Sequence, residues 1–220
     1  MNFEEQVKKD IVDELESDSR VDASNVKVTV NEHKAILEGT VDSYFAKESA
    51  EKDTWSISGV FRVENHLKIK YKTPPSLPVD NVIKQNIENS LLWSTEIDPT
   101  AIVVQVNNRI VTLSGEVKDY WQRLQAETQS SNMHGVQEVI NEISVIPTES
   151  IADEVIANDI VNKLRRNLFV DVDDVTVKVE HGEVTLSGRV PSFSARIAAR
   201  EAAENTSGVR DVESHILVSA

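Results

Sequence analysis

The sequence predicts an α+β protein built from three tandem modules, each with the element order α-β-β-α-β and a three-stranded sheet packed with two helices. Two glycines recur at one spacing in every copy. The copies align without a gap over this stretch when shifted by 76 and then 73 residues (Gly39 to Gly115 to Gly188). Self-similarity at a fixed period is the signature of a repeat protein. The modules are predicted at residues 1–72, 79–146 and 150–220.

The first helix of each module is predicted by apolar residues at i, i+4 and i+8, a spacing that places them on one helical stripe. The three stripes are Val7, Ile11 and Leu15, then Ile83, Ile87 and Leu91, then Ile156, Ile160 and Leu164. An apolar-Asp pair begins six residues after the end of each stripe, with the aspartates at Asp22, Asp98 and Asp171. Because aspartate side chains bond nearby backbone amides, we expect these three to organise the loop that enters the first strand.

The remaining elements follow in order. Alternating apolar and polar residues at 26–30, 102–106 and 175–179 predict the first strand, and a turn then leads into a second strand with a Leu-x-Gly-x-Val motif. Hydroxyl or carboxylate residues suited to N-caps open the second helix, and a final strand follows the second glycine. The predicted N-caps are Ser43, Asp119 and Ser192.

The six repeated glycines are predicted to have structural roles. The first of each pair lies in the second strand and is expected to let a helix pack closely against the sheet. The second is expected to end the second helix as a left-handed cap. The first set is Gly39, Gly115 and Gly188, and the second set is Gly59, Gly135 and Gly208.

Two connectors of different length join the modules. Residues 72–78 form a proline-rich linker, which is extended and stiff. Residues 147–150 form a shorter connection. We therefore expect the second and third modules to lie closer together than the first and second.

Composition limits the possible functions. The net charge is −14, and each predicted module is acidic, which disfavours nucleic-acid binding. The chain has no cysteine and hence no thiolate metal site or cysteine nucleophile. The N-terminus lacks the apolar run of a signal peptide, and no window of eighteen apolar residues occurs. We expect a cytoplasmic protein, or a periplasmic one if an export signal has been removed.

Catalysis is not predicted. The five histidines show no helical ligand spacing, the glycines form no phosphate-binding loop, and no carboxylate pair lies in a recognisable cleft context. We expect no enzyme activity, no metal site and no cofactor.

Two groups of residues are candidates for binding. Apolar and aromatic residues that are not shared by all copies suit a protein or lipid interface, or alternatively seal contacts between adjacent modules. They are Leu92, Trp93, Trp121 and Phe45. Three equivalent cations near the start of the second helix suit an anion such as a lipid headgroup, or alternatively a solvated helix face. They are Lys47, Arg123 and Arg196.

The repeat resembles the BON domain, a module of bacterial osmotic-shock and nodulation proteins. The resemblance is carried by the Val-x-Leu-x-Gly-x-Val strand and by the ending Gly-Val-x-x-Val-x-Asn, which stands at 59–65 and 135–141 and, with Ser214 for asparagine, at 208–214. It covers nearly the whole of all three copies. The resemblance implies binding rather than catalysis: of anionic phospholipid or envelope components, of potassium by a cytoplasmic member, or of clients by chaperone-like members.

The leading hypothesis is a non-enzymatic binding and scaffolding protein of the bacterial osmotic or envelope stress response, with anionic phospholipid or envelope proteins as partners. One alternative is a cytoplasmic potassium sensor in which loop acids such as Asp22, Asp98 and Asp171 coordinate the ion. Another is a chaperone-like holdase that uses exposed apolar patches.

Overall fold

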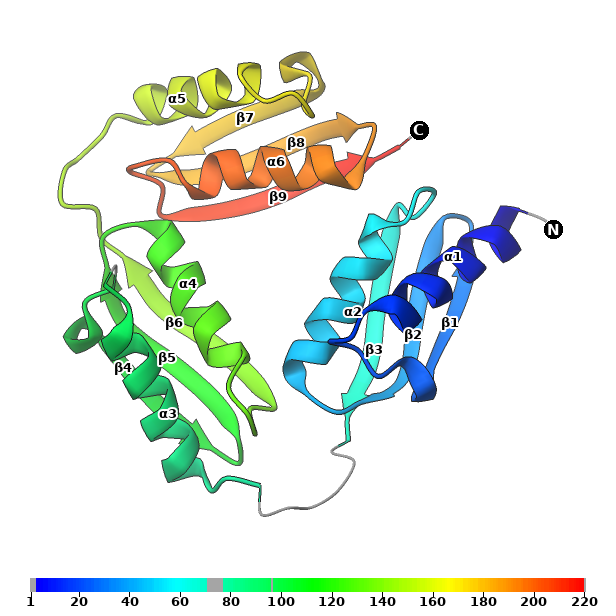
Figure 1. The fold of residues 1–220 in the computed structure, drawn as a ribbon. Coiled ribbons are helices and arrows are strands. Elements are labelled where there is room, and N and C mark those ends of the chain that lie inside the picture. Colours follow the sequence, from blue (N-terminus) through cyan, green and yellow to red (C-terminus); the bar gives the residue numbers. More distant parts are fainter. Residues whose placement is uncertain (1–2, 71–76, 96, 220) are drawn as a thin grey trace.

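The computed structural model describes residues 3–70, 77–95 and 97–219. It contains three α-β-β-α-β modules, which confirms the predicted fold class (Figure 1). Module 1 consists of α1 (Phe3–Ser17), β1 (Val26–Asn31), β2 (Lys34–Val41), α2 (Tyr44–Ser56) and β3 (Arg62–Ile69). Module 2 consists of α3 (Asp80–Trp93), β4 (Ile102–Asn107), β5 (Ile110–Val117), α4 (Tyr120–Ser131) and β6 (Glu138–Val145). Module 3 consists of α5 (Asp153–Arg165), β7 (Val175–Glu180), β8 (Glu183–Val190), α6 (Phe193–Glu204) and β9 (Asp211–Val218).

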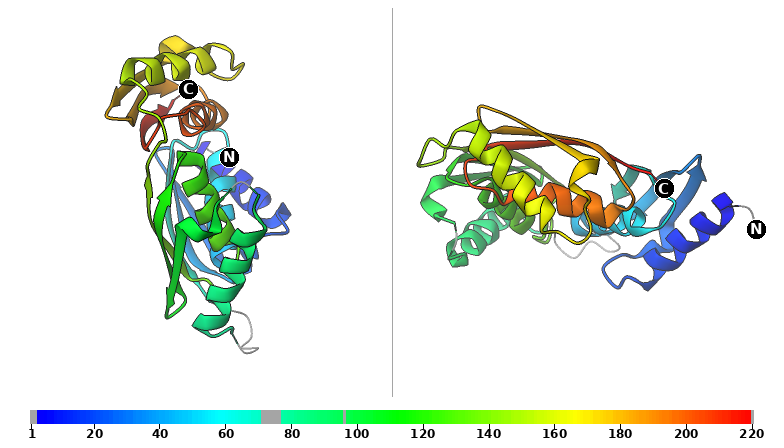
Figure 2. Two further views of the ribbon diagram at one scale, coloured as in Figure 1. Left: turned by 90° about the vertical axis from the view of Figure 1, so that its left-hand side faces the viewer. Right: turned by 90° about the horizontal axis from the view of Figure 1, so that it is seen from above.

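Each sheet has its second strand in the middle. The first pair of strands is antiparallel, and the second pair is parallel because the second helix returns the chain between them. Both helices of a module lie on the same side of its sheet (Figures 1 and 2). In module 1, Leu37 lies opposite Val28 on one side and Asn65 on the other. The first-helix stripes are buried in all three modules, as their spacing predicts.

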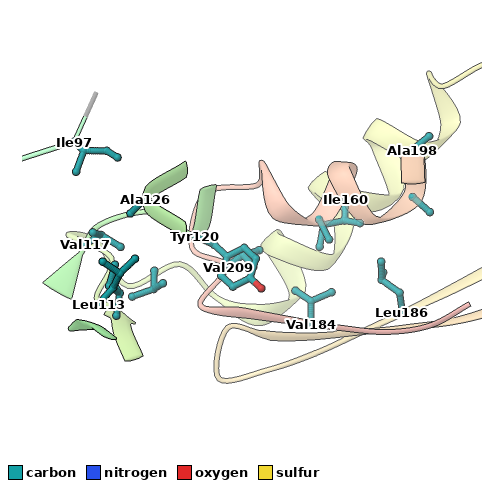
Figure 3. Close-up of a cluster of buried hydrophobic side chains, with 14 of the residues drawn as sticks. Ile97, Leu113, Val117, Tyr120, Ala126, Ile160, Val184, Leu186, Ala198 and Val209 are labelled. Carbon is teal, nitrogen blue, oxygen red and sulfur yellow. The ribbon is translucent and has the colours of Figure 1, made fainter. Parts of the chain in front are cut away.

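Modules 2 and 3 share one continuous apolar core, whereas module 1 has a core of its own. Tyr120, the first residue of α4, is only 6% exposed. Its ring lies beside Val209 of module 3 (Figure 3). This arrangement agrees with the expectation from the linkers that modules 2 and 3 lie closer together. Most of the proline-rich linker lies outside the described residues.

A short 3-10 turn before the first strand explains the first glycine of each module. These turns are η1 (Ala23–Asn25), η2 (Pro99–Ala101) and η3 (Val172–Asp174). At Gly115, where φ is +125°, a Cβ atom would lie 2.0 Å from the carbonyl oxygen of Ala101 in the turn. Gly39 and Gly188 meet the equivalent turns at the same distance. The expectation that a helix fills this space is therefore wrong, because the backbone of the 3-10 turn occupies it.

The second glycines do not cap the helices directly. The helices α2, α4 and α6 end three or four residues earlier, and the glycines follow in the next turn with φ between +86° and +95°. A Cβ at Gly135 would lie 2.7 Å from Pro78 Cγ, and one at Gly208 would lie 2.9 Å from Ile156 Cδ1. The left-handed conformation was predicted correctly. Its position was not, because these glycines make room for residues at the start of the first helix.

One carboxylate per module joins the first helix to the β-hairpin. Asp80 accepts hydrogen bonds from the backbone N–H groups of Asn108 (2.8 Å) and Arg109 (3.0 Å) in the turn between β4 and β5. Asp153 accepts the equivalent bonds in module 3, and Glu4 accepts one from Glu32 in module 1. These bonds lower the pKa of Asp153 from its ordinary value. The hairpin turn is thus fixed against the helix N-terminus.

Candidate interaction surface

Large apolar residues are strongly exposed where the first helix of modules 2 and 3 ends. Leu92 and Trp93, at the end of α3, are 62% and 84% exposed. We call this pair the module 2 tip. Leu168 and Phe169, in the loop after α5, are 98% and 65% exposed, and we call them the module 3 tip. Exposing side chains of this size to water is unfavourable, so the two tips are candidates for a contact surface.

The loop between β5 and α4 lies at the same end of module 2 as its tip. A pocket of about 350 Å³ is lined by both loops, including Thr95, Asp98, Lys118 and Gln122. Trp121, at the start of α4, is half-buried, and its neighbour Tyr120 belongs to the core shared with module 3. The structure therefore places Leu92, Trp93 and Trp121 at one end of module 2, with only the first two strongly exposed.

Phe45 is placed apart from the other predicted contact residues. It is 38% exposed at the start of α2 in module 1. The four predicted contact residues thus lie on two modules, three on module 2 and one on module 1.

The module 3 tip was not predicted from the sequence. Leu168 and Phe169 follow two exposed arginines, Arg165 and Arg166, at the end of α5. The signal was available, because an Arg-Arg-x-Leu-Phe segment at this place has no counterpart in the other copies. The segment combines cations with apolar side chains, which suits the interfacial region of a membrane.

Module 1 has an ionic network where modules 2 and 3 have apolar tips. Arg20 Nε lies 2.8 Å from Asp18 Oδ2, and Arg20 Nη2 lies 3.2 Å from Asp53 Oδ1 on α2. The Arg20 side chain holds the pKa of Asp18 well below its usual range. Burial, together with Asp18, raises the pKa of Asp53 to about 6. This loop is tied to α2 and carries no exposed apolar pair.

The network makes the stability of module 1 depend on pH. A carboxyl whose pKa is raised in the folded state stabilises the fold below its unfolded pKa of 3.8, and this contribution is lost as the pH rises through about 6. Asp18, whose pKa is lowered, stabilises the fold fully above pH 3.8 and loses this contribution only as the pH falls below that value, so it does not affect the slope above pH 4.5. We expect Asp53→Asn to reduce the fall in unfolding free energy of module 1 between pH 4.5 and pH 7. Urea unfolding of module 1 can be followed by the fluorescence of Trp55 in a background that carries Trp93→Phe and Trp121→Phe.

The matched control is Asp13→Asn, an exposed carboxylate on α1 of the same module. This variant should keep the pH dependence of the wild type. An unchanged slope in Asp53→Asn would contradict the role assigned to Asp53.

Two of the three predicted anion contacts take part in contacts between modules. Arg123 Nη1 lies 3.3 Å from Asp211 Oδ1 of module 3. The Arg196 guanidinium lies 4.5 Å from the ring centre of Trp55 in module 1. Lys47 is half-exposed on α2. Anion binding by these residues stays a prediction.

The loop aspartates organise their loops as predicted. Asp22, Asp98 and Asp171 each accept a hydrogen bond from the backbone N–H two residues later, at 2.9–3.1 Å, and so cap the 3-10 turns. Each lies in its own module. In the three stretches that the structure describes, no group of three or more His, Cys, Asp or Glu side chains is arranged to hold a metal ion. Potassium coordination by these aspartates stays a prediction.

The fold and the tips define a class of protein: a tandem-repeat α+β chain with exposed apolar side chains at the end of α3 and in the loop after α5. A model of the BON domain matches residues 4–71, 79–147 and 152–220. The chain therefore belongs to the BON domain family, which confirms the resemblance in its sequence.

Two curated relatives belong to the same family. The outer membrane lipoprotein DolP of Haemophilus influenzae is 31% identical over 139 residues, which is 60% of this chain and 71% of that protein. The osmotically-inducible protein Y of Escherichia coli K12 is 27% identical over 143 residues, 62% of this chain and 71% of that protein. The chain also aligns with a solved structure of CdsD, a structural protein of the type III secretion system of Chlamydia trachomatis. The alignment covers 97% of this chain and 92% of the CdsD chain. Its TM-score is 0.27 at 17% identity, too low to compare the two chains further.

The expected cytoplasmic location is wrong. A relative at 31% identity is an outer membrane lipoprotein, so the relatives of this chain point to the cell envelope. The expectation rested on the composition of the N-terminal residues, which form helix α1 of module 1. The composition of such a helix does not show where in the cell the protein is located. No described helix has the length and apolar character needed to cross a membrane.

Proposed function

We propose that this chain is a non-enzymatic binding protein of the bacterial envelope and osmotic stress response, which docks on anionic phospholipid surfaces through its apolar tips. The names of the two relatives, an outer membrane lipoprotein and an osmotically-inducible protein, support the setting. The observation that carries the proposal is the exposure of the tips: Trp93 is 84% and Leu168 is 98% exposed.

The energetics favour shallow insertion. Transfer of one large apolar side chain from water contributes about 1.5–3 kcal/mol, so each two-residue tip by itself supplies enough for weak binding. Arg165 and Arg166 add about 1 kcal/mol each near an anionic surface. The net charge of −14 opposes this attraction. Binding is therefore reversible and depends on the tips rather than on the overall charge.

Vesicle co-sedimentation tests the proposal. We expect the full chain to bind vesicles of phosphatidylcholine with 30 mol% phosphatidylglycerol. Leu92→Ser with Trp93→Ser should weaken binding at least tenfold, because the lost transfer energy exceeds about 1.4 kcal/mol. Leu168→Ser with Phe169→Ser should weaken it similarly. Arg165→Gln with Arg166→Gln should remove the preference for these vesicles over pure phosphatidylcholine.

Val79→Ser is the matched control. Val79 is 67% exposed just before α3, at the opposite end of that helix from the module 2 tip. This variant should bind as the wild type does. If both serine-substituted tips leave vesicle binding intact, or if the wild type does not bind at all, the proposal fails. If the chain does not bind vesicles but suppresses the aggregation of a client protein, that result would favour the holdase alternative.

A further inference from the structure

Modules 1 and 3, which are not adjacent in the sequence, meet through aromatic side chains. Trp55, near the end of α2, stacks on Phe193 at the start of α6, with ring centres 5.5 Å apart and planes 8° from parallel. The Arg196 guanidinium lies 4.5 Å from the centre of the Trp55 ring. Figure 1 shows α2 and α6 on the sides of their modules that face each other. We call Trp55, Phe193 and Arg196 the latch.

The packing around the latch is incomplete. A cavity of about 150 Å³ remains between the modules, lined by Ile57 and Phe61 of module 1 and Pro191 of module 3 as well as by the two stacked rings. Interior packing leaves few voids larger than a water molecule. Module 1 also keeps a separate core, in contrast to the shared core of modules 2 and 3. The contact has the character of a docked surface that can separate without unfolding either module.

Charge opposes this docking. Residues 1–72 carry 15 acids and 11 bases, and residues 73–220 carry 22 acids and 12 bases, so both parts are negative. Like charges also approach each other between module 1 and module 2, whose core is shared with module 3. Beyond the effect of burial, the charge of Glu127 on α4 raises the pKa of Glu48 on α2. The charges of Glu127 and Glu138 likewise raise the pKa of Tyr44. Burial and these carboxylates raise the pKa of Tyr44 to about 12. Among the cations, Lys47 partly offsets Glu48, and Arg123 is paired with Asp211. Arg196 of module 3 is attracted by Glu51 on α2, which is a favourable charge contact at the latch.

We propose that the latch is controlled by ionic strength, so that module 1 is released from module 3 in dilute salt and docks on it in concentrated salt. The Debye length is about 30 Å at 0.01 M and about 8 Å at 0.15 M. At 0.01 M salt, repulsion between whole modules therefore acts across the contact, whereas at 0.15 M salt it is largely screened. The ring stack and the half-buried Arg196 contact are short-ranged and are screened much less. Salt thus removes the opposing force and leaves the holding force.

Intramolecular energy transfer measures the docking. The chain contains no cysteine, so Lys9→Cys on α1 and Glu201→Cys on α6 give two unique dye sites, one on each module. We expect a low-transfer population at 10 mM NaCl and a high-transfer population at 300 mM NaCl. KCl should act as NaCl does, and sucrose of equal osmolality should have no effect. Identical transfer at both salt concentrations would overturn the proposal.

Variants on each side of the latch separate release from unfolding. Phe193→Ala and Arg196→Gln, both in module 3, should leave the chain in the low-transfer state at 300 mM NaCl, with unchanged far-UV circular dichroism. Glu48→Gln with Glu127→Gln should have the opposite effect. It should lower at least twofold the salt midpoint, which is the NaCl concentration at which half of the molecules are docked. Lys52→Gln, which removes an exposed cation from α2, should move the salt midpoint the other way, to higher salt, because it makes module 1 more negative. A high-transfer state in folded Phe193→Ala would overturn the assignment of the latch.

Discussion

Replacing Gly115 by alanine is expected to lower the free energy of unfolding of modules 2 and 3 by about 3 kcal/mol or more. The φ of +125° costs a residue with a Cβ about 1–3 kcal/mol, and forcing an extra methyl group into a filled site costs a similar amount. The obstacle is the Ala101 carbonyl oxygen, 2.0 Å from the new Cβ, and a backbone atom cannot rotate away as a flexible side chain can. Urea unfolding followed by circular dichroism gives the value.

Ser114→Ala is the matched control for this change. Ser114 precedes Gly115 on the same strand, and its side chain points to the opposite face of the sheet. Its variant should change the unfolding free energy by less than about 1 kcal/mol. A mild effect of Gly115→Ala, comparable to that of the control, would show that the 3-10 turn moves aside and that the glycine is not required.

Replacing Tyr120 by alanine is expected to separate the unfolding of modules 2 and 3. Truncation of a buried aromatic residue costs about 3–5 kcal/mol. Because Tyr120 is 6% exposed within the shared core and lies beside Val209 (Figure 3), much of that loss falls on the contact between the modules. In the wild type, calorimetry should show one transition for module 1 and one for modules 2 and 3 together. In the variant, the second transition should split.

Tyr44→Ala provides the comparison, since Tyr44 is the equivalent residue of module 1 and is only half-buried. It should cost less and leave the joint transition of modules 2 and 3 intact. A Tyr120 variant that keeps a single joint transition would mean that other contacts, such as the Arg123–Asp211 ion pair, hold the two modules together.

The architecture could be predicted from the sequence because each element repeats its own pattern three times. The stripe of Val7, Ile11 and Leu15 is buried as its spacing requires, and Asp22 caps its turn as aspartates do. These features depend on contacts within one element or between neighbours. The packing partner of Gly39 was mistaken for the opposite reason. A sequence shows which face of a strand lacks a side chain, but not which backbone fills the space.

The candidate surface was predicted only in part. Trp93 is as exposed as an unshared apolar residue at a helix end should be, whereas Trp121 is half-buried. Exposure of residues near a module boundary depends on docking between modules. The stack of Trp55 on Phe193 joins residues 138 positions apart, and no periodic pattern encodes such a pair. Comparison of the copies for unshared segments would have found Leu168 and Phe169.

The carboxylate that joins the first helix to the hairpin turn has a consequence for synthesis of the chain. In module 2, Asp80 accepts hydrogen bonds from Asn108 and Arg109 within a segment that contains α3, β4 and the turn before β5. This portion can assemble on the ribosome before the third strand emerges, since local contacts form first. Tyr120, however, finds its cover only after module 3 has been made. A nascent chain that stops at the end of β6 would present that ring to chaperones.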